Sequence, residues 1–144
     1  MAETPKPMGY WFKHIDKTLE DNFVALLATE GLQRRHWQIT HTLSGGPLDA
    51  PALDVALSPF LNAQDPTAAP YVGVLIARGW VEVDDAGTYA LTPEGVDAHA
   101  KLFERIQIQR RAATEGLTDD DYRTLMVLLQ RVSANVDAFA RTLR

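Results

Sequence analysis

The chain has 144 residues, of which 46% are hydrophobic and 23% are charged, and its formal net charge is −5 at pH 7. This composition is typical of one globular domain, or of a small domain with helical extensions. The absence of cysteine excludes disulfides, thiolate catalysis and thiolate zinc sites. There is no apolar run long enough to span a bilayer and no secretory signal pattern, so we expect a cytoplasmic protein.

Helical periodicity predicts two helices in the first third of the chain. The first begins at residue 8 or 9, runs to residue 30 and is ended by Gly31. The second runs from about residue 33 to residue 43, and the break at 44–47 ends it. Their predicted apolar faces are Phe12, Ile15, Leu19, Phe23 and Leu26 in the first helix, and Trp37, Ile39 and Leu43 in the second.

Two shorter helices are predicted next. Asp49 or Ala50 caps a helix that includes residues 53–57. The following helix runs to Arg78, and its start has two alternatives. Asp65 followed by proline is typical of an N-cap and first turn, but that start would leave Pro70 inside the helix, at a cost of about 3 kcal/mol. The second alternative is that the helix begins at Pro70 itself.

Residues 71–95 encode a helix, a short hairpin and a second helix. Gly79 can adopt the left-handed conformation that ends the first of these helices. Residues 80–84 and 88–91 alternate apolar and polar side chains around turn-forming residues, which predicts two paired strands. Thr92 then supplies an N-cap oxygen and Pro93 takes the first helical position, so a helix restarts at once.

Two long helices are predicted to complete the chain. The first runs from residue 93 to about residue 115 and is ended by Gly116, with an apolar side at Val96, Ala100, Phe103 and Ile106. Thr118 and the three acids that follow it are a strong start signal for the last helix. The last helix carries a coiled-coil-like seam at Tyr122, Leu125, Leu129, Val132, Val136, Phe139 and Leu143.

This seam needs a partner surface. The apolar faces of the terminal helices together exceed what a small lobe of one chain can bury, so we expect a homodimer rather than the alternative of a compact monomer. The predicted interface residues are Phe12, Ile15, Leu125, Leu129, Val132, Val136 and Phe139.

The order of helix, hairpin and helix is that of a winged helix-turn-helix. Two motifs, Arg78-Gly79-Trp80 and Leu91-Thr92-Pro93-Glu94-Gly95, resemble the MarR family of bacterial transcriptional regulators. The resemblance implies a mainly α fold with a small β-hairpin wing and long N- and C-terminal dimerisation helices. It also implies a single domain over residues 1–144, in which dimerisation helices at 8–32 and 93–144 flank a winged lobe at 33–92.

The charge of this lobe differs from that expected of a DNA-binding surface. Residues 45–95 contain seven acids and one base, Arg78, for a net charge of −6, whereas the remainder has twelve acids and thirteen bases. Phosphate binding needs cations, and an acidic surface repels the duplex. The predicted recognition helix also lacks a bidentate base reader, since it offers Thr67, Ala68, Ala69, Pro70, Tyr71 and Gly73.

Two functions therefore remain open. The first is a dimeric DNA-binding transcriptional regulator, in which three arginines contact phosphates and two further side chains reach the groove. These candidate residues are Arg34, Arg35, Arg78, Thr67 and Tyr71. Each has an ordinary structural alternative, as a solvated helix start, a helix-end cation or a packed aromatic. The second is a winged-helix dimer that has weak or lost DNA binding and acts through a protein partner.

A small aromatic effector is compatible with either function. The resemblance implies a crevice between the dimerisation helices and the lobe, and aromatic and imidazole side chains from the two helices expected to line it suit an apolar anion. The candidate ligand residues are Trp11, His14, Trp37 and His41. The alternative is that these side chains are core or ordinary hydrogen-bonded residues.

Enzyme chemistry has little support in the sequence. The histidines, at 14, 36, 41 and 99, lack metal-ligand spacing, and no glycine-rich phosphate loop or nucleophile elbow is present. The acid clusters are explained by a turn and a helix start. We therefore predict a protein that is not an enzyme and that has no metal and no cofactor.

Overall fold

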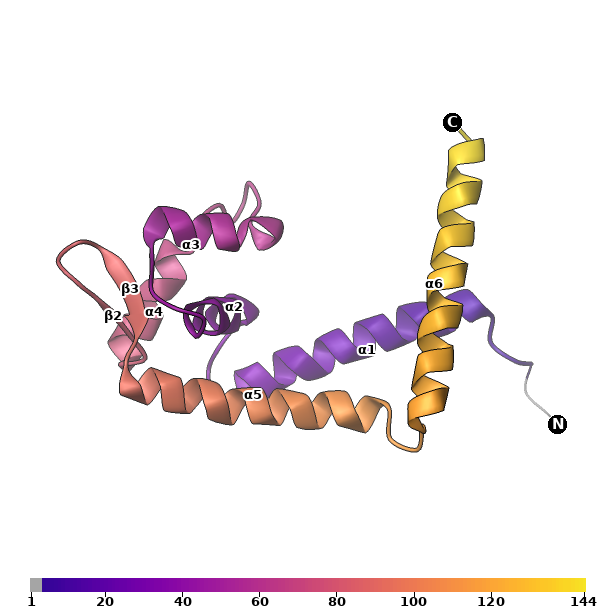
Figure 1. The fold of residues 1–144 in the computed structure, drawn as a ribbon, viewed down its shortest axis with the longest axis horizontal. Helices are drawn as coiled ribbons and strands as arrows, with labels where there is room; N and C mark the ends of the chain where they lie inside the picture. The colour runs from indigo at the N-terminus through magenta and orange to yellow at the C-terminus, as the bar shows by residue number, and fades with distance from the viewer. Residues whose placement is uncertain (1–3) are drawn as a thin grey trace. The chain divides into compact units, whose positions relative to one another are not determined.

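The computed structural model describes residues 4–144 and contains a small antiparallel sheet among helices (Figure 1). The chain divides into two compact units, Met1–Gln107 and Ile108–Arg144. The first unit holds α1 to α4, the sheet and most of α5, and the second holds the end of α5 and α6. Over residues 4–144, no helix has the length and apolar character needed to cross a membrane.

The first two helices agree with the sequence prediction. Helix α1 spans Met8–Ala28, and Gly31 adopts a φ of 68° just beyond it. Helix α2 spans Arg34–Leu43, and its predicted inner face is buried. Only the C-terminal end of α1 enters the core of the first unit, because Leu26 and Leu27 are buried whereas Phe12, Ile15 and Leu19 remain 39%, 50% and 48% exposed.

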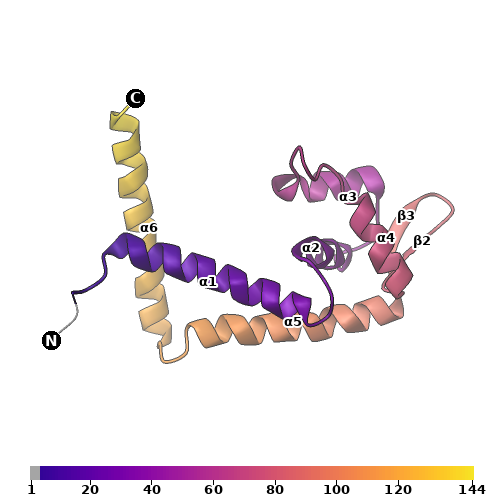
Figure 2. The same cartoon turned by 180° about the vertical axis from the view of Figure 1, so that it is seen from behind.

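Helix α3 spans Ala50–Ala56 and is capped as predicted, since the Asp49 carboxylate accepts a hydrogen bond from the amide of Ala52 at 2.9 Å. A short 3-10 helix, η1, follows at Ser58–Phe60. In Figures 1 and 2, α2 is seen nearly end-on within the first unit, with α3 and α4 on one side of it and α5 on the other.

Helix α4 spans Ala69–Arg78, so the predicted start at Asp65 is wrong and the alternative start near Pro70 holds. Pro70 lies in the first turn, where its missing amide removes no helical hydrogen bond. Asp65 does not cap the helix because residues 62–65 form a tight bridge of their own. The free amide of Ala68 instead donates to the Asp54 carboxylate of α3 at 2.9 Å.

The hairpin forms as predicted, with a third strand added. Strand β2 (Val81–Val83) pairs with β3 (Thr88–Leu91), and β3 pairs on its other edge with β1 (Leu48–Asp49), both antiparallel. The turn is held by the Asp84 carboxylate, which accepts hydrogen bonds from the amides of Ala86 and Thr88 at 3.0 and 2.9 Å. We call residues 81–91 the wing.

Helix α5 spans Pro93–Ala113 and begins at a close backbone contact. The Thr92 hydroxyl accepts a hydrogen bond from the amide of Gly95 at 3.0 Å and donates to the carbonyl of Gly79 at 2.5 Å. A Cβ atom at Gly95 would lie 2.0 Å from the carbonyl oxygen of Trp80, so no side chain fits there.

This contact also fixes which side of α5 faces inward. The buried side is Gly95, Leu102 and Ile106, with Phe103 half-buried. Of the predicted apolar side, Ile106 is buried and Phe103 is half-buried, whereas Val96 and Ala100 are exposed. The predicted apolar side did not include Gly95, although its contact with Trp80 belongs to the buried side of the helix.

The core of the first unit draws on every helix in it and on β2. Its packing joins the end of α1 to the winged lobe, so the lobe has no separate core of its own. The buried apolar residues are Leu26, Leu27, Leu32, Trp37, Ile39, Leu43, Leu53, Leu57, Ala68, Val72, Leu75, Trp80, Val81, Leu102 and Ile106.

The second unit is dominated by α6, Asp119–Thr142, with Gly116 at a φ of 87° before it. The predicted start is confirmed: the amide of Asp121 donates to the Thr118 hydroxyl, and the amide of Thr118 donates to the Asp121 carboxylate, both at 3.0 Å. No residue of α6 is buried. Within the second unit the predicted seam is largely uncovered, with Val136 61% and Phe139 65% exposed and Leu129 and Val132 half-buried.

Candidate nucleic-acid interface

Helix α4 follows α3 in the helix-turn-helix and has an apolar outer side. Val72 and Leu75 are buried beneath it, whereas Tyr71 and Arg78 are half-buried at its edge. The exposed side chains carry no charge and no hydrogen-bonding group: Ala69, Pro70, Gly73, Val74, Ile76 and Ala77. A surface helix ordinarily presents polar residues to solvent, so this face has the composition of a contact surface.

Arg35 lies beneath the turn that leads into α4. Its Nη2 atom donates to the carbonyl of Phe60 at 2.8 Å and to the Asp65 carboxylate at 2.9 Å. The arginine side chain is only 10% exposed, and that of Asp65 is 30% exposed. Arg35 therefore joins α2 to both ends of the turn, and its guanidinium group is directed into the protein.

Tyr71 completes this network from the first turn of α4. Its hydroxyl donates to the same Asp65 carboxylate at 3.1 Å, and this hydrogen bond is the main cause that raises the pKa of Tyr71 above its usual value. Its ring lies edge-to-face with the buried His36 ring at 5.3 Å. We call Arg35, Asp65 and Tyr71 the α4 brace. Thr67, in contrast, is exposed just before α4.

The two other candidate arginines are also held within the chain. Arg78 donates to the carbonyl of Glu30 at 2.7 Å, and its guanidinium lies 5.1 Å from the centre of the Trp80 ring. Arg34 pairs with Glu20, and its guanidinium lies over the Phe23 ring at 5.2 Å. Of the three, Arg34 joins the lobe to α1, and Arg78 joins it to the segment that follows α1. Phosphate contact by these arginines stays a prediction.

Much of the acidity of the lobe has a structural use. Asp49, Asp54 and Asp84 each accept backbone hydrogen bonds at a helix start or in the wing turn, and Asp65 belongs to the brace. Glu82 and Asp85 are exposed on the wing. The wing itself is therefore acidic, and its residues 81–91 include no lysine or arginine.

An aromatic cluster joins α2 to α5. Trp37 and His41 are one helical turn apart on α2, and His99 and Phe103 are one turn apart on α5. The Trp37 ring stacks on His41 at 5.2 Å and on His99 at 5.3 Å, and His41 stacks on Phe103 at 5.9 Å. The sequence did not point to His99 and Phe103 as candidate ligand residues, although they have the same four-residue spacing as Trp37 and His41.

The two histidines of this cluster are hydrogen-bonded to each other, with His41 Nδ1 and His99 Nε2 3.0 Å apart. One ring must be the donor and the other the acceptor, so this contact requires at least one neutral ring. Burial, and then the charge of His41, lower the pKa of His99 below its usual value. In the described part of the chain, no three histidine or acidic side chains gather into a group that could hold a metal.

Trp11 and His14 form a separate group on the exposed part of α1. Their rings lie 6.5 Å apart, and both contact Tyr10. Among residues 4–144, no ring contact links this pair to Trp37 or His41. The structure therefore brings the four candidate ligand residues together as two pairs rather than as one site.

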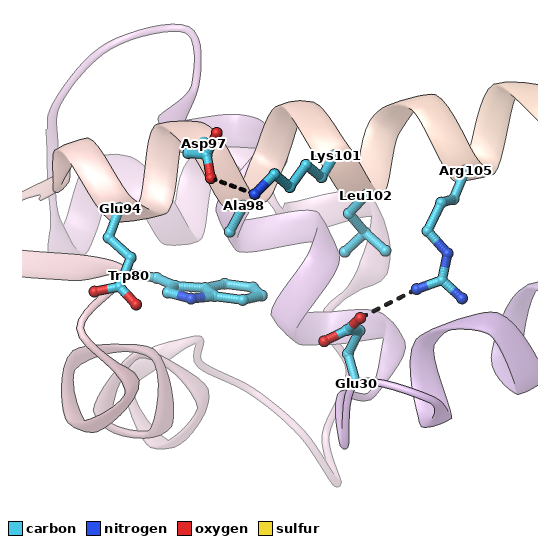
Figure 3. Close-up of a pocket in the computed structure, with 8 residues that line it drawn as sticks. All are labelled: Glu30, Trp80, Glu94, Asp97, Ala98, Lys101, Leu102 and Arg105. Carbon is cyan, nitrogen blue, oxygen red and sulfur yellow. Dashed lines mark hydrogen bonds and ion pairs between the residues drawn. The ribbon is translucent and has the colours of Figure 1, made fainter.

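Two hollows lie elsewhere in the first unit. A pocket of about 200 Å³ has Trp80 as a wall and two ion pairs at its rim, Asp97 with Lys101 at 2.9 Å and Glu30 with Arg105 at 3.1 Å (Figure 3). A second, of about 560 Å³, lies beside the α4 brace and includes Arg34, Gln38 and Phe60 in its lining. Neither of these two hollows includes a predicted ligand residue.

The fold is that of known regulators. The reduced form of MarR from E. coli matches with a TM-score of 0.65 and 19% identity, over 90% of this chain and 95% of that one. A MarR family protein of Mycobacterium tuberculosis matches with a TM-score of 0.67 and 20% identity, over 88% and 94%. A mutant of E. coli MarR complexed with operator DNA matches with a TM-score of 0.61 and 19% identity, over 88% and 93%.

No protein-family model and no curated protein sequence matches this chain. At these identities the structural matches show the fold: a mainly helical winged helix-turn-helix with a small antiparallel sheet, as the MarR resemblance implies. The function is a separate question, because one fold can carry unrelated activities.

The α4 brace predicts that Arg35 stabilises the lobe. Arg35→Met should lower the free energy of unfolding by about 2 kcal/mol, because Asp65 loses a charged hydrogen-bond partner and the turn loses its link to α2. Urea unfolding followed by circular dichroism measures this. Arg123→Met is the matched control, since Arg123 and Asp120 form an ion pair with side chains 73% and 88% exposed, and its unfolding midpoint should not change. An Arg35 variant as stable as the parent would contradict the brace.

Proposed function

We propose that this protein is a dimeric, DNA-binding transcriptional regulator of the MarR type. The observation that carries the proposal is the fold. Over 88% of its length, the chain matches the structure of a MarR mutant complexed with operator DNA. In a helix-turn-helix the second helix enters the major groove, and here that helix is α4. The exposed outer face of α4 leaves it available for such a contact.

The proposed DNA contacts divide by exposure. Thr67 is exposed at the start of α4 and can reach the groove directly, and the Arg34 side chain is 41% exposed, so exchange of its Glu20 partner for a phosphate is feasible. Arg35, Tyr71 and Arg78 are held inside the lobe, so in this proposal they contribute mainly by fixing α4 and its neighbours in place.

Dimerisation is proposed through the terminal helices. The support is the amount of apolar surface that one chain leaves open on α1 and α6, where Ile15, Leu125 and Phe139 are 50%, 40% and 65% exposed. Soluble monomers rarely expose such surface, and a self-complementary helical seam suits a two-fold interface.

A small aromatic acid is proposed as effector. The support is the aromatic cluster, in which the half-buried Phe103 ring offers an apolar face and the His41–His99 pair offers ring nitrogens to a carboxylate. Trp11 and His14 are the second candidate group, on α1.

The charge of the lobe favours a second candidate function, in which the winged dimer acts through a protein partner. Residues 45–95 carry seven acids against one base, and the α4 face is apolar. The excess of acids would repel a DNA duplex. A protein surface, in contrast, could bind both the acidic residues and the apolar face of α4.

The dimer proposal predicts the effect of a charge in the α6 seam. Val136→Asp should convert the dimer to a monomer in sedimentation velocity, because it buries an unpaired carboxylate in the interface. Val127→Asp is the matched control: Val127 is 60% exposed, like Val136 at 61%, but lies on the opposite face of α6. The proposed seam is refuted if Val127→Asp dissociates the protein and Val136→Asp does not.

The effector proposal predicts that calorimetric titration with 2-hydroxybenzoate gives saturable binding. His99→Ala should weaken it at least tenfold, because the substitution removes a stacked ring and a nitrogen from the cluster. His14→Ala is the control for the α1 group and should bind like the parent. Loss of binding in His14→Ala alone would move the site to Trp11 and His14.

The regulator proposal predicts sequence-selective binding to a duplex from the protein's own upstream region, measured by fluorescence anisotropy against an unrelated duplex in a salt series. Because few cations face the lobe's exterior, we expect a shallow salt dependence, with few counterions released. If a folded dimer binds neither duplex at low salt, the protein-partner function takes its place.

A further inference from the structure

The exposed face of α4 limits how the helix can distinguish one base pair from another. Base pairs differ in the major groove by their donors, their acceptors and the methyl group of thymine. Reading a donor or an acceptor requires a hydrogen-bonding side chain, and the exposed residues of α4 provide none. The nearest exposed hydroxyl belongs to Thr67, which precedes the helix.

An apolar surface against base edges also carries a penalty that depends on sequence. Each amino group or carbonyl that loses water without gaining a partner costs free energy, whereas a thymine methyl gains by leaving water. A helix of this composition therefore favours positions where methyl groups meet its side chains and disfavours positions that present unpaired amino groups.

We propose that α4 reads its operator through thymine methyl groups, with Val74 as the principal contact. This inference rests on the proposed DNA-binding function and adds the chemistry of its readout. Val74 is 44% exposed and is the largest side chain on the outer face of the first two turns of α4. Nothing in the protein lies within 4 Å of a Cβ built at Gly73, so the adjacent helix surface is open to close approach by a base edge.

The inward-facing residues of the first two turns of α4 support this orientation. The α4 brace holds Tyr71 inward through Asp65, and Val72 and Leu75 are buried, so the helix cannot rotate to expose a polar side. The apolar face is therefore the one that meets any partner of α4.

The test replaces thymine by uracil, which removes the methyl group and keeps every hydrogen-bonding atom. Anisotropy titrations compare the upstream duplex that the protein selects with the same duplex containing uracil at each thymine. We expect affinity to fall about fourfold for each methyl group that α4 contacts. The unrelated duplex should bind equally well with either base.

Val74→Thr identifies the contact, because it keeps the branched shape and replaces one methyl by a hydroxyl. This variant should lose most of the preference for thymine over uracil. Val55→Thr is the matched control, since Val55 is 73% exposed on α3, and it should keep the preference of the parent. Circular dichroism confirms that both variants are folded.

The outcomes separate the readout from the function. Equal affinity for the thymine and uracil duplexes, with selectivity over the unrelated duplex retained, would overturn the methyl readout and leave the regulator function standing. A preference for thymine that persists in Val74→Thr would overturn the role of Val74. Failure to bind any duplex would refute the regulator function itself, and the methyl readout with it.

Discussion

The winged lobe depends on one junction, where the first turn of α5 meets the backbone of Gly79 and Trp80. Thr92 is central to it: its amide donates to the carbonyl of Trp80 at 3.0 Å, and its hydroxyl bonds to both Gly79 and Gly95. Four elements, α4, β2, β3 and α5, end or begin within this contact. The absence of a side chain at Gly95 allows it, and the resulting orientation of α5 brings His99 and Phe103 to α2.

A second set of contacts engages arginine side chains that could otherwise bind phosphates. Arg35 and Arg78 each donate to a backbone carbonyl, of Phe60 and of Glu30, and so hold the turn and the end of α1 to the lobe. Arginines held in this way contribute to the placement of α4, and their donors are already engaged within the chain. The acids at the helix starts and in the wing turn also have structural roles, since their carboxylates accept backbone hydrogen bonds. The negative charge of the lobe is in part the result of how it folds.

Local signals in the sequence predicted most of the fold. The caps at Asp49, Thr92 and Thr118, and the left-handed glycines after α1 and α4, act within a few residues, so the helix ends could be located. The start of α4 could be narrowed only to two alternatives, because the choice depends on the bridge at residues 62–65 and on Asp54, which accepts a hydrogen bond from the amide of Ala68, 14 residues away. The part played by Gly95 in orienting α5 could not be inferred either, since it rests on a contact with the backbone of Trp80.

The candidate site was less predictable than the fold. The apolar character of α4 follows from its sequence. Which arginines are hydrogen-bonded within the protein could not be inferred, because their partners, such as Asp65 and Glu30, are distant in sequence. The pairing of His41 with His99 likewise joins residues 58 positions apart. Interactions between distant segments decide these features, and periodicity carries no information about them.

The exposed seam of α6 has a consequence for how the protein unfolds. Because no residue of α6 is buried, the long helix gains little from packing within its own unit, and its own hydrogen bonds and cap stabilise it only marginally. Any surface that covers the seam is therefore part of the folding equilibrium of this segment. If a second copy of the chain covers the seam, as proposed, the midpoint of its melting depends on concentration, and dilution loosens α6 before the core of the first unit is affected.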